Sequence, residues 1–261
     1  MSARVSSLPG LPPLLACAGL LALWEVAARV FAISGLPPAH EALRDLPALL
    51  SDREALVNIA HSLRRMAVGF ALALAFAVPV GLAMGRSRLV AALFNPLLMA
   101  IYPVPKAALM PIIMLWLGIG DASKTLVIFL GVSLPVIYHS YQGARAVEEK
   151  MLWSAAAMGM PPWRRLRHVV LPASLPQIFA GVRTGLVLAL ITMVTSEMIA
   201  RQAGIGNILF NSLDMALYAS VYATIIVIGV LGFALDVAIE WLRARLIGWA
   251  EPTHQIAVSA A

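Results

Sequence analysis

The sequence predicts an all-α membrane protein with six transmembrane helices. Apolar residues make up 61% of the 261 positions and charged residues only 12%, whereas soluble domains carry about 25% charged residues. The chain contains several apolar runs of the roughly 20 residues that a helix needs to cross a bilayer. These runs are expected to be helical, because a segment in lipid must pair its own backbone groups.

The six expected spans follow one another from residue 11 to residue 235. The first is the least apolar, since it carries Glu25 and Arg29, and the second has no charge at all. The third is long and contains four prolines. We place the spans at Leu11–Phe31, Met66–Gly85, Leu89–Leu117, Thr125–Tyr141, Ile178–Ile199 and Met215–Leu235.

The remaining segments divide the chain into three regions. Residues 1–65 form an N-terminal tail, the first span and a mixed-charge linker from Ser34 to Arg65, whose second half reads as a helix along the membrane surface. Residues 66–250 form the transmembrane core, with a large loop at 142–177. Residues 251–261 form a tail after a helix, Ile239–Arg245, that leaves the membrane beside Trp241.

The distribution of basic residues predicts that both termini and the large loop are cytoplasmic. With the N-terminus inside, ten Lys and Arg residues fall on the inner side and six on the outer side. Cytoplasmic loops carry such an excess. The inner ten are Arg4, Arg86, Arg88, Arg145, Lys150, Arg164, Arg165, Arg167, Arg243 and Arg245, and the outer six are Arg44, Arg53, Arg64, Arg65, Lys124 and Arg201.

Cys17 ends a run, Leu14 to Cys17, that is similar to a lipoprotein processing site. The apolar run continues to Leu23, however, whereas the apolar region of a signal peptide precedes its cleavage site. We therefore expect the first span to stay attached.

No motif in the sequence indicates that this chain catalyses a reaction. Gly118 to Thr125 is similar to a phosphate-binding loop, but Ser123 stands where a glycine must precede the lysine. The five histidines are scattered, and no pattern of metal ligands or of a nucleophile beside a base can be read. We expect no catalytic residue, no metal and no cofactor. The net charge of +6 is explained by basic residues at the ends of spans, so no nucleic acid is expected as a partner.

The large inner loop contains the most informative local pattern. Good helix formers from Glu148 to Met158 are followed by Gly159 and then by Pro161 and Pro162, which end a helix sharply. A short helix on such a loop is suited to docking a cytoplasmic protein. The alternative is a helix lying on lipid headgroups, with Arg164, Arg165 and Arg167 on anionic lipid.

The third and fifth spans carry unusual residues for a membrane interior. Pro103 and Pro105 flank a break, and Lys106 is a costly charge unless it faces water or a partner. The sequence leaves open whether Lys106 lines a pathway or extends to the interface. Arg183 is close enough to the inner boundary to extend to it, and Glu197 is expected to pair with Arg201 at i,i+4 spacing.

Small residues recur at four-residue spacing at Gly81 and Gly85 and at Gly181 and Gly185. Such pairs let helices approach closely in lipid. Packing within the chain is favoured over a dimer seam.

The inner loop resembles the signature of ABC importer permeases that work with an external binding protein. That signature is Glu-Ala-Ala, three residues, Gly, nine residues, then Ile-x-Leu-Pro. Ala155, Gly159, Val169, Leu171 and Pro172 stand in register with it, whereas Trp153 replaces the glutamate and Ser154 the first alanine. Glu148 and Glu149 are candidates to substitute for the glutamate, although they lie a turn or more earlier.

The resemblance extends from about Ala67 to Trp249 and is greatest with the nitrate, sulfonate and taurine type of permease. It is carried by "YPVPKAALMPIIMLWLGIGDASK", "RHVVLPASLPQIFAGVRTGL" and "SEMIARQAGIGNILFNS". It implies the MetI-like fold of type I ABC importers, located in the bacterial cytoplasmic membrane.

The resemblance also implies the partners and the site. The partners are a cytoplasmic ABC ATPase dimer, a periplasmic or lipid-anchored solute-binding protein, a second permease chain (a homodimer is expected) and membrane lipid. The solute is expected to be a small anion. Coupling to the ATPase is assigned to Trp153, Ser154, Ala155, Ala156, Gly159, Met160, Leu171 and Pro172, and the pathway to Pro103, Pro105, Lys106 and Glu197.

Two other classes of protein predict features that the sequence lacks. A secondary transporter driven by an ion gradient should show inverted repeats and several carboxylates within its spans. A membrane enzyme should show a cluster of His, Asp or Cys residues on one side of the membrane. The secondary transporter is kept as the alternative.

Overall fold

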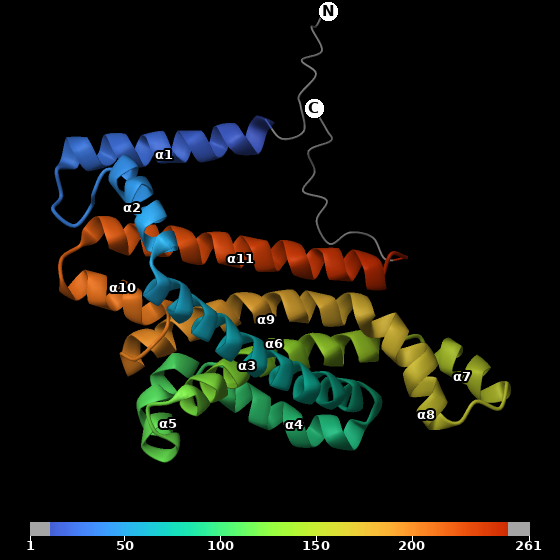
Figure 1. Cartoon of the computed structure of the whole chain (residues 1–261). Helices are drawn as coiled ribbons and strands as arrows, with labels where there is room; N and C mark the ends of the chain where they lie inside the picture. Colours follow the sequence, from blue (N-terminus) through green and yellow to red (C-terminus); the bar gives the residue numbers. More distant parts are fainter. Residues whose placement is uncertain (1–10, 250–261) are drawn as a thin grey trace, which may run out of the picture.

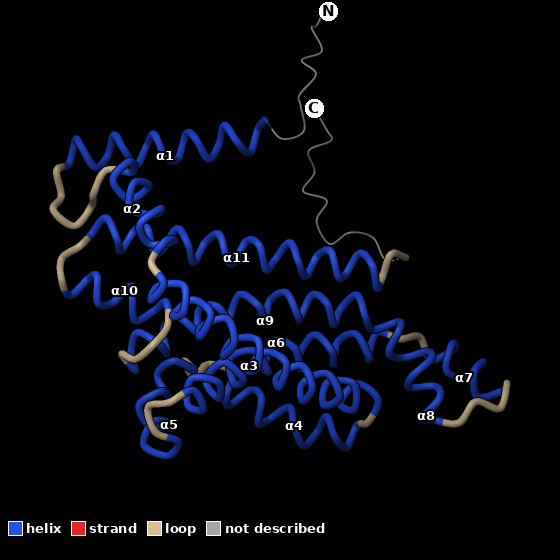
Figure 2. Tube along the Cα trace, in the orientation of Figure 1, coloured by secondary structure: helices blue, strands red, loops and turns tan. Residues whose placement is uncertain are grey.

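The computed structural model describes residues 11–249, and that part of the chain is a bundle of helices joined by short turns (Figures 1 and 2). The tails 1–10 and 250–261, including Arg4, lie outside the described residues. The five long helices are α1 (Leu11–Phe31), α3 (Arg53–Arg86), α6 (Asp121–Ala146), α9 (Leu171–Ala200) and α11 (Tyr218–Leu246). The shorter ones are α2 (Ala39–Ser51), α4 (Arg88–Ile101), the 3₁₀-helix η1 (Lys106–Leu109), α5 (Met110–Leu117), α7 (Glu149–Ala157), α8 (Pro162–Arg165) and α10 (Ile205–Asp214).

The helices agree with the prediction of six spans if one bent pair is counted as a single span. Five helices are long and apolar enough to cross a membrane. The remaining span, which is the third in chain order, consists of α4 followed by η1 and α5. The two parts of that pair meet at a bend of 83°. Prolines at 103 and 105 lie at the bend, where their missing N–H groups end the helix.

Residues 54–65 do not form a surface helix, contrary to the expectation from sequence. They are the first part of α3, whose 34 residues continue without interruption into the second span. A helix of that length spans about 50 Å, well over the thickness of roughly 30 Å of the apolar layer. Asp52 starts the helix by accepting hydrogen bonds from the N–H groups of Glu54 (3.1 Å) and Ala55 (3.3 Å).

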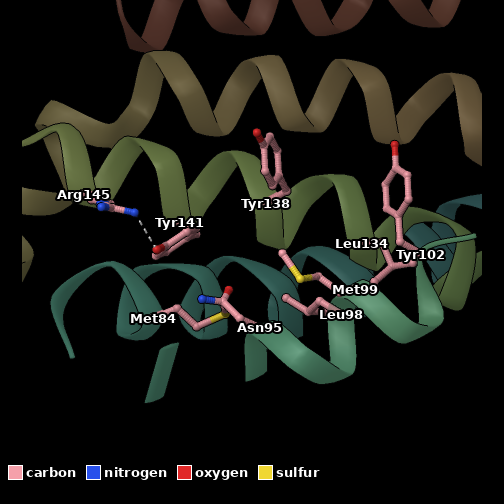
Figure 3. Close-up of a pocket in the computed structure, with 9 residues that line it drawn as sticks. All are labelled: Met84, Asn95, Leu98, Met99, Tyr102, Leu134, Tyr138, Tyr141 and Arg145. Atoms are coloured by element: carbon pink, nitrogen blue, oxygen red, sulfur yellow. Dashed lines mark hydrogen bonds between the residues drawn. The ribbon is translucent and has the colours of Figure 1, made fainter. Parts of the chain in front are cut away.

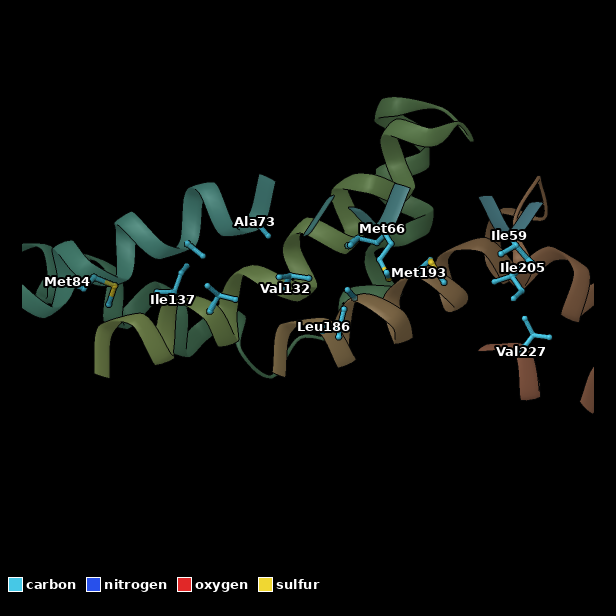
Figure 4. Packing of buried hydrophobic residues seen from close by; sticks show 14 residues of the cluster. Ile59, Met66, Ala73, Met84, Val132, Ile137, Leu186, Met193, Ile205 and Val227 are labelled. Atoms are coloured by element: carbon cyan, nitrogen blue, oxygen red, sulfur yellow. The ribbon is translucent and has the colours of Figure 1, made fainter. Parts of the chain in front are cut away.

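The core of the bundle is the contact of α6 with α3 on one side and α9 on the other. Figure 4 shows apolar side chains from these three helices meeting along one seam, together with Ile205 of α10 and Val227 of α11. Glycines bring the backbones close along it. A Cβ on Gly85 would lie 2.4 Å from the Cβ of Ala144, and one on Gly181 would lie 2.7 Å from the Cβ of His139.

The paired glycines therefore pack within the chain, as expected. A Cβ on Gly81 would lie 2.5 Å from Ser140 Cβ, and one on Gly185 would lie 3.1 Å from Val132 Cγ1. Both predicted pairs sit on contacts of α6 with its neighbours.

Glu25 and Arg29, the charged residues of the first span, take part in the contact between α1 and α2. The carboxylate of Glu25 accepts a hydrogen bond from Arg29 Nε (2.7 Å) and another from the backbone N–H of His40 (3.2 Å), and it pairs with His40 Nδ1 at 2.9 Å. His40 is in the first turn of α2, so Glu25 supplies an acceptor to unpaired N–H groups at the start of that helix. In turn, α2 packs on α11, where Ser220 donates to Asp45 (2.7 Å).

Replacing Gly85 by Leu should destabilise the bundle, because the added side chain collides with Ala144 across the contact of α3 with α6. Overpacking of a close contact costs about 1–3 kcal/mol or more, so we expect a lower midpoint of thermal unfolding in detergent. Gly229→Leu on α11 is the matched control, since a Cβ there meets nothing within 4 Å. Equal midpoints for the two variants would contradict this account of the seam.

Candidate functional site

The inner loop forms two short helices, α7 and α8, which project together from one end of the bundle (Figure 1). The described ends of α1 and α11 nearest the chain termini lie at that same end of the bundle in Figure 1. The predicted helix at 148–158 is present as α7, residues 149–157.

Gly159 ends α7 because it adopts a backbone conformation that few other residues tolerate. Its φ is +78°, in the left-handed region that glycine enters without strain. This turn lets the N–H of Gly159 donate to Ala156 O (2.9 Å) and the N–H of Met160 donate to Ala155 O (3.0 Å). Two carbonyls that would be unpaired at the helix end are thereby satisfied, in the arrangement known as the Schellman motif.

The predicted coupling residues divide between two faces of α7. Leu152 and Ala155 are buried against the bundle, whereas Ser154, Ala156 and Gly159 are exposed. Trp153 is 66% exposed. The structure therefore brings the exposed members together on an outer face and uses Ala155 for packing.

The outer face of α7 and α8 carries large apolar side chains in an exposed position. Met158 is 76% exposed and Trp163 is 63% exposed, close in sequence to the exposed Trp153. Large apolar groups gathered at an exposed end indicate an interaction surface. We call Trp153, Met158 and Trp163 the outer apolar face of the loop.

The buried face of α7 contributes to an apolar cluster that three spans also enter. Leu152 belongs to a cluster that contains Leu82 of α3, Ala144 of α6 and Val182 of α9. Arg86 at the end of α3 also forms an ion pair of 3.0 Å with Glu149. Glu149 is thus engaged inside the chain, and this ion pair and Leu152 link α7 to the spans.

Leu171 and Pro172, the last of the predicted coupling residues, lie at the start of α9. Both are half-buried, and Leu171 packs on the cluster beneath α7. A π-helical turn, Leu166–Val170, joins α8 to α9 without a gap, so the inner loop continues directly into the fifth span.

Lys106 caps the broken third span. Its Nζ donates to the carbonyl oxygens of Ile101 (2.7 Å), Tyr102 (3.3 Å) and Val104 (2.5 Å). These are carbonyls at the end of α4 and in the turn after it, where the regular helix is interrupted, and the carbonyl of Ile101 also accepts from the N–H of Val104 (3.2 Å). The ammonium therefore completes the break within its own segment.

The break lines a hollow of about 450 Å³ between the third, fourth and fifth spans. Among the described residues that line it, Lys106 is the one that carries a charge, and Thr184 and Thr192 of α9 contribute hydroxyl groups. Pro103 and Pro105 line it as well. The structure brings these three predicted pathway residues to one place.

Glu197, the fourth predicted pathway residue, lies elsewhere, in a buried cluster of charges at the opposite end of the bundle from α7. It is fully buried, and its carboxylate accepts hydrogen bonds from Ser62 Oγ (2.7 Å), Arg65 Nη1 (2.9 Å) and the N–H of Gly206 (3.0 Å). Arg65 also donates through Nε to Asp121 (2.5 Å). The positive and negative groups are thus matched, as burial of charge requires.

The same cluster holds the turn between α9 and α10. The carbonyl of Ala203 accepts from Arg65 Nη1 (2.7 Å) and Lys124 Nζ (3.3 Å), and the N–H of Gly204 donates to Asn58 Oδ1 (2.7 Å). Gly204 has φ +135°, and a Cβ there would lie 2.2 Å from Glu197 Cδ. Only glycine lets this turn sit directly on the carboxylate.

One expectation for charged residues in the fifth span was wrong. Glu197 does not pair with Arg201, because Arg201 is in the left-handed conformation (φ +47°) and turns away to Asp214 (3.1 Å). Arg183, which was expected to extend to the inner interface, donates twice to Asp236 of α11, each at 2.6 Å.

Comparisons with known proteins agree with this arrangement of helices. The profile of the family described as "Binding-protein-dependent transport system inner membrane component" matches residues 77–248. The chain belongs to this family. It is also 33% identical, over 88% of its length and 86% of the relative, to the taurine transport system permease protein TauC of Escherichia coli (strain K12).

More distant relatives cover as much of the chain. Identity is 28% to the putative aliphatic sulfonates transport permease protein SsuC of Bacillus subtilis, over 90% of this chain and 86% of that one. Identity is 25% to the nitrate import permease protein NrtB of Synechocystis, over 90% and 88%. The chain is thus an ABC transporter permease of the nitrate, sulfonate and taurine type with a MetI-like fold, and a multi-pass membrane protein.

Sequence reasoning missed most of the charged cluster of the permease. Asn58, Ser62 and Arg65 were placed in a linker, and Asp121 and Lys124 fell in the stretch that is similar to a phosphate loop. The spacing of the first three, i, i+4 and i+7, puts them on one face of a helix. This polar face leads directly into an apolar span, and it could have predicted that the helix begins before the span and that its polar face meets buried partners.

Replacing Glu197 by Ala should destabilise the permease strongly, because Arg65 and the turn at 203–206 lose their shared acceptor. Removing one partner of a buried ion pair costs about 3–5 kcal/mol. Asp214→Ala is the matched control, since its pair with Arg201 is half exposed and such pairs contribute about 0–1 kcal/mol. Thermal unfolding in detergent measures both, and a stability of Glu197→Ala equal to that of the control would contradict the proposed importance of the cluster.

Proposed function

We propose that this chain is the transmembrane subunit of an ATP-driven ABC importer for a small anionic solute, such as taurine, another sulfonate or nitrate. The solute would be delivered by a periplasmic or lipid-anchored solute-binding protein. Hydrolysis of ATP would occur in a separate cytoplasmic ATPase dimer. The names of the relatives support the class of solute, and the shape of the inner loop supports the mechanism.

The observation that carries this proposal is the two-faced helix α7. On its inner face Leu152 shares a buried cluster with residues of α3, α6 and α9, and Glu149 pairs with Arg86 of α3. Trp153, Met158 and Trp163 are exposed and available to a partner. A partner that grips the outer face and moves would carry those three span ends with it, because packed interiors transmit displacement rather than absorb it. Closure of the ATPase dimer would in this way change access to the pathway.

Trp153 gives the docking contact a different chemistry from the family signature. A glutamate at this position would make a charged contact with the ATPase, whereas an exposed indole favours an apolar pocket. Glu149 is not free to replace the glutamate without giving up its pair with Arg86. We therefore assign docking to Trp153, Ser154, Ala156 and Gly159, with Ala155, Met160, Leu171 and Pro172 supporting them from below.

The pathway is assigned to the hollow at the break rather than to the buried cluster. Pro103, Pro105 and Lys106 line that hollow, and the charge of Lys106 favours an anion nearby. Glu197 is fully enclosed, so its role is to hold the outer turn at 203–206 in place.

A second copy of the chain would complete the transporter. Helix α1 packs on the rest of the chain mainly through α2, and Leu14, Leu20 and Leu23 on it are each more than 60% exposed. Lipid and the second permease chain are the apolar partners that would cover them. In the bacterial cytoplasmic membrane, α7, α8 and both termini would face the cytoplasm, in accord with the excess of basic residues there.

The proposal is tested by transport in proteoliposomes that contain the permease alone or with the ATPase subunit and binding protein encoded beside it. We expect accumulation of taurine or nitrate only when all three proteins and ATP are present. Uptake by the permease alone, driven by an ion gradient, would instead establish the alternative of a secondary transporter.

Gly159→Val should uncouple the complete transporter, because a β-branched residue at φ +78° is strained and distorts the end of α7. We expect ATP-dependent uptake to fall at least about tenfold, which corresponds to a strain of about 1–2 kcal/mol, while membrane insertion is unchanged. Asn tolerates the left-handed region, so Gly159→Asn is the matched control and should retain most uptake. Full uptake by Gly159→Val would argue against docking at this turn.

A further inference from the structure

A second hollow, of about 610 Å³, lies between α3, α4 and α6 (Figure 3). It adjoins the hollow at the break, because Tyr102 and Leu134 line both. Its other end is formed by Arg145, in the last turn of α6. The two hollows are therefore neighbours along α6, and we refer to them together, from Lys106 to Arg145, as the α6 groove.

The face that α6 presents to this groove carries three polar side chains in a lining that is otherwise mostly apolar. Leu134, Tyr138, Tyr141 and Arg145 follow one another at spacings of four, three and four residues, so they lie on one face of the helix. Tyr138 is 55% exposed, and Arg145 is exposed as well. Polar side chains along a membrane helix mark a solute path or a polar interface, since lipid does not solvate them.

The two tyrosines are held with their hydroxyl protons available. Gln142 Nε2 donates to the hydroxyl of Tyr138 (2.9 Å), and Arg145 Nη1 donates to the hydroxyl of Tyr141 (3.0 Å). Within residues 11–249, neither hydroxyl donates to a protein acceptor. Each hydroxyl accepts one bond and keeps its own O–H to donate.

The opposite wall adds one more donor. Asn95 of α4 faces the groove across from Tyr141 in Figure 3. In the described part of the chain its amide makes no hydrogen bond with another residue, so its N–H groups are also unused. The groove thus offers an amide, a guanidinium and the hydroxyl groups of Tyr102, Tyr138 and Tyr141, and the described residues that line it include no carboxylate. The hydroxyls of Thr184 and Thr192 donate within α9.

This set of groups has the chemistry of an oxyanion site. Sulfonate, sulfate, nitrate and phosphate groups need several hydrogen-bond donors and gain further from a guanidinium, which binds such anions through two N–H groups. Lys106 adds positive charge at the far end, although its three donors are engaged with carbonyls. An anion would be attracted at both ends of the groove and bound through hydrogen bonds chiefly at the Arg145 end.

We propose that the α6 groove is a transit site for the oxyanion on its way to the cytoplasm, with Tyr138, Tyr141, Asn95 and Arg145 as its ligands. This inference rests on the proposed function, because it assigns a route to the solute of that importer. Arg145 lies three residues before Glu148, at which α7 is capped, and Ala144 packs in the cluster beneath α7. Movement of α7 would therefore shift the Arg145 end and release the anion there.

The test uses the complete transporter in proteoliposomes, with taurine as the transported probe and the ATPase activity measured in parallel. For Arg145→Gln, we expect the rate of taurine uptake to fall about tenfold to a hundredfold, as expected for the loss of a charge-assisted hydrogen bond. Stimulation of ATP hydrolysis by the binding protein should persist. Arg145→Lys should restore part of the uptake, because it keeps the charge, and Tyr138→Phe with Tyr141→Phe should lower uptake while retaining both rings.

Arg88→Gln is the matched control, since Arg88 is exposed at the start of α4 and does not line the groove. Wild-type uptake together with unchanged uptake by Arg145→Gln would overturn the transit site and leave the proposed importer standing. An effect of Arg145→Gln that occurs only in vesicles containing phosphatidylglycerol would assign the anion to a lipid headgroup and would also overturn it. Absence of ATP-dependent uptake by the wild-type transporter would instead refute the proposed function.

Discussion

Inside a bilayer, a backbone N–H or C=O group that leaves a regular helix must be paired by the protein itself, because no water is present to do so. The same need for partners, at a break within a span and at helix ends in the connections between spans, accounts for the positions of several charged side chains in this permease. At the break in the third span, the ammonium of Lys106 pairs with three carbonyls. At the turn after α9, Glu197 and Arg65 pair with Gly206 N–H and Ala203 O. Glu25 does the same at the start of α2.

Once these groups are paired, irregular segments can exist where the transport mechanism needs them. The break bends the third span by 83° and opens a hollow against α6 and α9, while Lys106 keeps the bend stable without a counterion from another helix. The outer turn is different: it is closed tightly on a buried carboxylate, and Gly204 leaves no space between them. One irregular segment therefore shapes a cavity, and the other is a rigid anchor for α10.

Helix α6 connects the parts of the permease that have to move together. Glycines on α3 and α9 let it contact both helices closely along its length, its first turn holds Asp121 in the charged cluster, and its last turn holds Arg145 beside α7. A displacement at the inner end is thus passed along a packed helix. The face of α6 that carries Tyr138, Tyr141 and Arg145 is not covered by α3 or α9 and lines the α6 groove.

The sequence by itself determined the class of fold, the six apolar segments, the short inner helix and the glycine that ends it. These depend on local patterns: apolar run length, helix formers and the special φ of glycine. The sequence did not determine where α3 begins, because the helical stripe of Asn58, Ser62 and Arg65 has meaning only once Glu197, more than 130 positions later, is known to face it.

Tertiary structure also decided which charges pair. Local spacing suggested that Glu197 meets Arg201, but the left-handed turn at Arg201 gave both residues other partners. The pair of Arg183 with Asp236 of α11 also depends on the fold. Local spacing likewise did not decide whether Lys106 lines a pathway or extends to the interface. Its contacts with backbone carbonyls depend on the bent conformation of the chain after α4, which the sequence does not give. A charged side chain is satisfied by whatever group the fold brings to it. For Lys106 that group is in its own segment, whereas for Glu197 and Arg183 it lies on another helix.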